Sequence, residues 1–137
     1  MPVTPRPHTT PSASVPLGPV VHSFAASVGS DAVAVRAVLE PLREAFAEHR
    51  AATEGETGLY ADVVQDAPRL ARTVDGLVAE HDCIDAAMAR LALIADGGAS
   101  SDLVRQQAHE VLSTLLRHGR RDADLVHEAY VTDIGGE

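Results

Sequence analysis

Apolar residues recur every three or four positions along three long stretches of this chain, and this spacing limits the fold more than any other feature. The three rows contain Val35, Leu39, Leu42 and Phe46; Leu70, Val74, Leu77, Ile84, Met88 and Leu91; and Val104, Ala108, Val111, Leu115 and Leu125. A period of 3.6 residues puts such side chains on one face of an α-helix, whereas a half-buried strand needs strict alternation. Aromatic residues make up only 3% of the chain, which also disfavours a sheet. We therefore predict an all-α fold.

Helix start and stop signals divide the chain into three long helices and one shorter helical piece. The long helices are expected over about residues 30–53, 66–95 and 100–131, and the shorter piece over 59–64. Ser30 is a suitable N-cap for the first long helix, and Pro41 predicts a kink within it. Short connections between long helices favour an up-and-down antiparallel helical bundle. Either an N-terminal helical turn or the 59–64 piece is expected to fill the fourth side.

The first 28 residues are rich in Pro, Ser and Thr and contain little apolar surface. Such a composition does not offset the entropy cost of ordering, so we predict a disordered tail over 1–28 and the bundle over 29–137. The segment lacks the continuous apolar region of a signal peptide, and no stretch is apolar enough to cross a bilayer. With a single cysteine, Cys83, these observations favour a cytoplasmic location.

The charge and the short motifs exclude several classes of function. Twenty acidic against 11 basic side chains give a net charge of −9, which repels phosphate backbones and anionic membranes. We expect neither nucleic acid nor a membrane as a partner, and nothing indicates which protein partner the chain has. No glycine-rich phosphate loop or Cys-x-x-Cys pair is present, so nucleotide and zinc-ribbon sites are not predicted.

Three histidines fall on the apolar rows, where polar residues are unexpected: His49, His81 and His118, with Asp122 one turn after the last. Burying imidazoles together without partners costs roughly 1–3 kcal/mol each. A bound metal ion removes this cost, because histidine is a common transition-metal ligand. Acids at helical spacing, as in Asp122 and Asp85, are typical of metal sites in helical bundles. His109 and His127 lie half a turn away from the His118 face and are interpreted as surface residues.

Three segments resemble the hemerythrin-like (HHE cation-binding) domains, which are four-helix bundles with a non-haem di-iron centre. These segments are His49-Arg-Ala-Ala-Thr-Glu54, Leu77-Val-Ala-Glu80-His81 and His118-Gly-Arg-Arg-Asp122, and the resemblance covers about residues 35–130. It implies a metal site with iron, as one or two ions, and dioxygen, peroxide, nitric oxide or iron itself as the molecule bound or sensed. The ligands that it implies are His49, Glu54, His81, His118 and Asp122.

The sequence departs from the family pattern at several of these positions. The family glutamate follows its histidine by four residues, whereas here Thr53 stands there and Glu54 comes one later, so a local bulge is needed. Asp85 replaces a histidine one turn after His81, and the first-helix histidine has no equivalent except His22. These departures leave open a di-iron site, a single metal ion, or no metal at all.

The alternative function is a metal-free helical interaction or regulatory domain with a degenerate site. Oxygen carriers, sensors and oxidases share this architecture, so the resemblance does not decide whether the protein is an enzyme. Among the neighbouring residues, Glu80 is interpreted as an exposed flank, Tyr60 as an aromatic at the edge of the core and Cys83 as a small packing residue.

Overall fold

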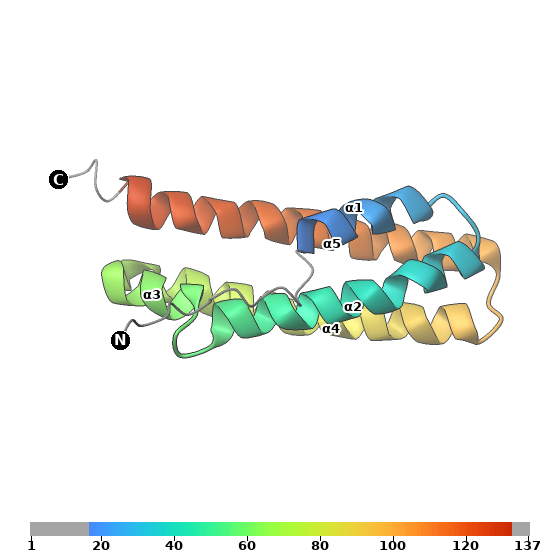
Figure 1. Ribbon diagram of the computed structural model, residues 1–137, viewed down its shortest axis with the longest axis horizontal. Helices are drawn as coiled ribbons and strands as arrows, with labels where there is room; N and C mark the ends of the chain where they lie inside the picture. Colours follow the sequence, from blue (N-terminus) through green and yellow to red (C-terminus); the bar gives the residue numbers. More distant parts are fainter. Residues whose placement is uncertain (1–16, 133–137) are drawn as a thin grey trace, which may run out of the picture.

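The computed structural model describes residues 17–132, and within them all regular structure is helical (Figure 1). The helices are α1 (Leu17–Ser27), α2 (Ala32–Glu54), α3 (Leu59–Asp66), α4 (Ala71–Asp96) and α5 (Ser101–Val126), with a 3₁₀ turn at Pro68–Leu70 and a π-helical turn at His127–Thr132.

The long helices α2, α4 and α5 lie along the length of the molecule, and α4 runs antiparallel to both α2 and α5 (Figure 1). Helix α1 packs against α2 and α5 in one half of the bundle, and the short α3 packs against α2 and α4 in the other half. The predicted all-α, up-and-down bundle is therefore confirmed. The fourth side of the bundle is formed by α1 in one half and by α3 in the other, so both predicted candidates contribute to it.

Helix α1 corrects the predicted extent of the N-terminal tail. Residues 17–27 are helical, and the Phe24 side chain is fully buried in the core with Val28 at 3% exposure. Val20 and Val21 pack against the same core cluster, so this short segment has an apolar face long enough to dock. The prediction of disorder was wrong for this part, because Phe24 and the valines around it bury enough apolar surface to dock the segment. Residues 1–16 lie outside the described residues.

The helix ends agree with the sequence signals to within a few residues. Asp31 rather than Ser30 caps α2, accepting a hydrogen bond from the Ala34 backbone N–H at 2.9 Å, and the helix continues through Pro41. Asp66 ends α3 instead of capping the next helix, which begins after the 3₁₀ turn. Ser100 caps α5, at the predicted start of that helix.

The apolar rows are buried as predicted, and they form two separate clusters. The first cluster contains Phe24, Val28, Val35, Leu39, Leu42, Phe46, Ile84, Met88, Leu91, Ala95, Val104, Ala108, Val111 and Leu115. The second contains Tyr60, Val63, Ala67, Leu70, Val74, Leu77, Leu125 and Ala129. Along α4, His81 stands between Leu77 of one cluster and Ile84 of the other, so a polar layer separates the two. None of the helices in residues 17–132 combines the length and apolar character that crossing a bilayer requires.

Candidate metal centre

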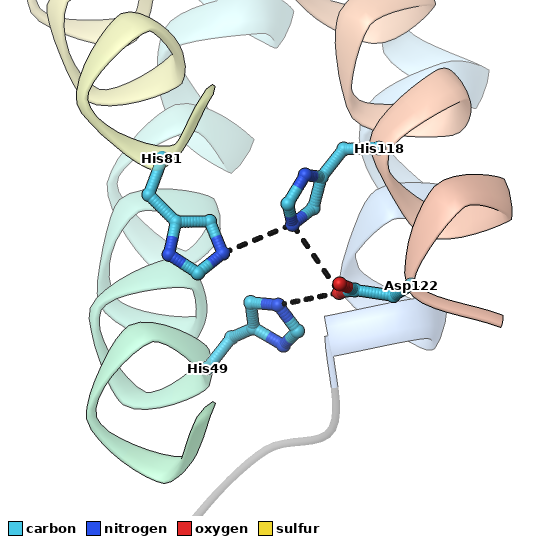
Figure 2. A group of neighbouring side chains, drawn as sticks. All are labelled: His49, His81, His118 and Asp122. Carbon is cyan, nitrogen blue, oxygen red and sulfur yellow. Dashed lines mark hydrogen bonds and ion pairs between the residues drawn. The ribbon is translucent and has the colours of Figure 1, made fainter. Parts of the chain in front are cut away.

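Four side chains from three helices converge in the layer between the two apolar clusters (Figure 2). His49 comes from α2, His81 from α4, and His118 and Asp122 from α5. Each offers one nitrogen or oxygen atom, and these four atoms all lie within 4.8 Å of one another. The described residues thus contain a buried group that can hold a metal ion.

The helical spacing explains why these four side chains meet. His118 follows the buried Leu115 by three residues, and Asp122 follows His118 by four, so both face the interior from successive turns of α5. His81 and His118 are 0% and 1% exposed, and the side chains of His49 and Asp122 are 21% and 15% exposed. The site is therefore shielded from water on the α4–α5 side and less so near His49.

Two glutamates fix the proton positions on the two buried rings. Glu54 contacts Nδ1 of His81, and Glu80 Oε1 lies 2.6 Å from Nδ1 of His118. Because a carboxylate only accepts hydrogen bonds, each Nδ1 carries the proton, and each neutral ring then has its lone pair on Nε2. Histidines that bind metals are commonly held in this way, with a carboxylate on the far ring nitrogen.

The three histidine Nε2 atoms face one another, and within the described residues the one on His49 has no hydrogen-bond partner. His81 Nε2 and His118 Nε2 lie 3.0 Å apart, so two lone pairs face each other in a buried space when both rings are neutral. His49 Nε2 is buried and makes no hydrogen bond, and the nearby anionic oxygen, Asp122 Oδ2, lies 3.1 Å away. A cation between these atoms satisfies all three nitrogens at once.

Asp122 supplies a negative charge to the cluster through one oxygen. Its Oδ2 lies 3.1 Å from His49 Nε2 and 3.2 Å from His118 Nε2, while Oδ1 accepts a hydrogen bond from the Tyr60 hydroxyl at 2.5 Å. Burial raises the pKa of Asp122, but its contacts with His118, His49 and Tyr60 outweigh this effect and hold the pKa well below its usual range. Asp122 is therefore an anionic donor at neutral pH.

The pKa values of the two buried histidines move in opposite directions. Burial lowers the pKa of His81 more than its contact with Glu54 raises it. Burial also lowers the pKa of His118, but its hydrogen bonds with Asp122 and Glu80 outweigh this and raise it. A proton on His118 is thus the main competitor for a metal ion at the cluster.

The structure brings together four of the five predicted ligands and places Glu54 differently. Helix α2 is regular up to Glu54, without the bulge that would turn this side chain inward, so Glu54 reaches the outer nitrogen of His81 instead. Thr53 stands where the family has its glutamate, and its hydroxyl donates to the His49 carbonyl at 2.9 Å. Asp85 pairs with Arg50 and is not part of the cluster.

The other three histidines of residues 17–132 lie away from the cluster. His22, His109 and His127 are all exposed, in agreement with the surface interpretation of the last two. His22 therefore does not replace the first-helix histidine of the family.

Two residues next to the cluster were assigned the wrong role from the sequence. Glu80 was interpreted as an exposed flank, but its side chain is only 12% exposed and contacts His118. Its place directly before a buried residue put it at the border of the buried face of α4, but the sequence does not show which helix packs beside that border. Tyr60 was interpreted as a core-edge aromatic, whereas it is 3% exposed and donates to Asp122.

Comparisons with protein-family models, with curated proteins and with solved structures gave no match to this chain. What the cluster binds is therefore inferred from its donor atoms and their surroundings.

Proposed function

We propose that the protein is a hemerythrin-like metal-binding bundle that holds non-haem iron at His49, His81, His118 and Asp122. The observation that carries this proposal is the pair of Nε2 atoms 3.0 Å apart on rings whose Nδ1 atoms both contact carboxylates. Three imidazoles and one carboxylate suit iron and zinc, among other first-row metals. Iron is favoured over zinc by the resemblance of the His49, His81 and His118 segments to the hemerythrin-like family.

The chain's own residues have distinct roles in this proposal. Glu54 and Glu80 orient the His81 and His118 rings and direct their lone pairs inward. Phe46 packs against the rings of His49, His81 and His118, with centroid distances of 5.8, 5.4 and 6.3 Å, and limits their movement. Iron held there supplies redox and Lewis-acid chemistry toward a small ligand such as dioxygen, peroxide or nitric oxide.

Metal analysis of the full chain, purified without an affinity tag, tests the proposal. After reconstitution with Fe(II) under anaerobic conditions and removal of loose metal, we expect close to stoichiometric iron. Parallel reconstitution with Zn(II) and Mn(II) shows whether iron is preferred. Less than about a tenth of an equivalent of every metal at neutral pH would rule out the metal site. That result would favour the metal-free interaction domain, with a proton shared between the facing rings.

Acidification should release the metal, because protons compete for the Nε2 atoms of the histidines. In the ion-free protein the pKa of His118 is raised, so protonation of His118 stabilises the folded state at low pH. This contribution to the free energy of unfolding is lost as the pH rises through that pKa. As the pH is lowered, the metal affinity should therefore start to fall while the pH is still above the ordinary histidine pKa of about 6.5. With each further unit of acidification it should decrease by about tenfold for every proton that the metal displaces. Competition with a chromophoric chelator between about pH 8 and pH 5.5 measures this, and a flat profile would contradict the assignment of histidine ligands.

A further inference from the structure

Each carboxylate around the histidine cluster has a second partner, which limits the number of ions that the cluster can take. Asp122 turns Oδ2 toward His49 and His118, while its Oδ1 accepts the Tyr60 hydroxyl at 2.5 Å. A carboxylate that bridges two ions in the most common mode uses one oxygen for each ion. Here the hydroxyl occupies one of the two oxygens.

Tyr60 is held firmly in this position by the turn before α3 and by packing. A Cβ at Gly58 would lie 2.5 Å from the Ala52 carbonyl oxygen, so glycine is needed where α3 approaches the end of α2. The Tyr60 ring is 3% exposed and stacks on the His81 ring at a centroid distance of 5.8 Å. The hydroxyl is therefore fixed in place against Asp122.

The two glutamates are held away from the cluster by arginines. Glu54 pairs with Arg50, with Nε–Oε2 at 2.9 Å, in addition to its contact with His81 Nδ1. Glu80 uses Oε1 for His118 Nδ1 at 2.6 Å and Oε2 for Arg121 at 2.9 Å. The other Glu54 oxygen, Oε1, also contacts Arg50 at 3.4 Å, so every oxygen of the two glutamates already contacts an arginine or a histidine Nδ1.

We infer that the cluster takes a single metal ion, and that Tyr60 is a positioning residue that keeps Asp122 a one-oxygen ligand. Di-metal sites in helical bundles use several carboxylates from facing helices, and their ions lie about 3.5–4 Å apart. Within residues 17–132, only one group of metal-binding side chains is present, and it contains one carboxylate. This inference rests on the proposed function, because it concerns the number of ions at the same cluster.

Titration of the ion-free full chain with Co(II) tests the inference through stoichiometry and visible absorption. The wild type should bind one equivalent and show the strong visible bands of Co(II) with few ligands, which weaken as the coordination number rises. In Tyr60→Phe the ring is kept but Oδ1 of Asp122 is freed, so the bands should weaken and the affinity should fall by about tenfold or more. Tyr130→Phe is the matched control, because Tyr130 hydrogen-bonds Asp66 instead of a cluster residue.

The possible outcomes separate this inference from the proposed function. Two tightly bound equivalents in the wild type overturn the single-ion inference and leave the metal-binding function intact. Identical spectra and affinities for wild type and Tyr60→Phe overturn the role of Tyr60. Absence of Co(II) binding in the wild type overturns both. The wild-type stoichiometry needs no variant, so the test stands even if Tyr60→Phe folds poorly.

Discussion

Replacing either fully buried histidine, His81→Ala or His118→Ala, should abolish the stabilisation that metal gives to the fold. At a free metal concentration a hundredfold above Kd, binding adds about 2.7 kcal/mol to the free energy of unfolding, which raises Tm by about 10 °C in a domain of this size. Both side chains are essentially inaccessible to solvent and offer Nε2 to the cluster, so each variant loses a ligand that water cannot easily replace. The measurement is the difference in Tm with and without metal, together with the metal content after gel filtration.

This difference separates ligand loss from ordinary core damage. Each variant also leaves a cavity, which lowers Tm with or without metal, but only ligand loss removes the increase in Tm on adding metal. His109→Ala and His127→Ala are matched controls, because both histidines lie exposed on the carboxyl-terminal part of the bundle. They should bind metal and respond to it like the wild type. Wild-type metal content in both His81→Ala and His118→Ala would disprove the site.

The fold was predictable because its main determinant is local. The spacing of apolar residues sets which face of each helix is buried, and short connections leave the three long helices little choice but an antiparallel arrangement. An N-terminal helical turn was expected, but the full extent of helix α1 was not predicted. Its apolar face is short, with Phe24 as its one fully buried apolar side chain, and so few apolar residues leave only a weak periodic signal in the sequence.

The site residues were predictable where the spacing within one helix determines which way a side chain faces. They were not predictable where the placement of a neighbouring helix determines the contact. His81, His118 and Asp122 lie on buried faces that the apolar rows define. The contacts of Glu80 and Tyr60 depend on how α5 and α3 are placed relative to α4, which the sequence pattern does not specify. Glu54 was displaced from the ligand set because an intact α-helix is more stable than the bulge that would turn its side chain inward.

The docking of α1 gives the second large expected effect, a loss of stability in Phe24→Ala. The Phe24 side chain is fully buried among residues of the first apolar cluster, and removing a buried phenylalanine costs about 3–5 kcal/mol. The free energy of unfolding of a native domain is about 5–15 kcal/mol, so this change should remove a large fraction of it. Urea denaturation of the ion-free protein, followed by circular dichroism, measures it as a lower midpoint.

His22→Ala is the matched control for this variant, because His22 lies exposed on the same helix only two residues away. It should change the free energy of unfolding by no more than about 0.5 kcal/mol, as surface substitutions usually do. If α1 were instead a loosely attached tail, Phe24→Ala would behave like His22→Ala. A loss below about 0.5 kcal/mol in Phe24→Ala would therefore show that the bundle is stable without α1. The first cluster adjoins the histidine layer through Phe46 and Ile84, so a change in its packing would be felt at the metal site. If Phe24→Ala leaves that packing intact, its metal affinity should also match that of the wild type.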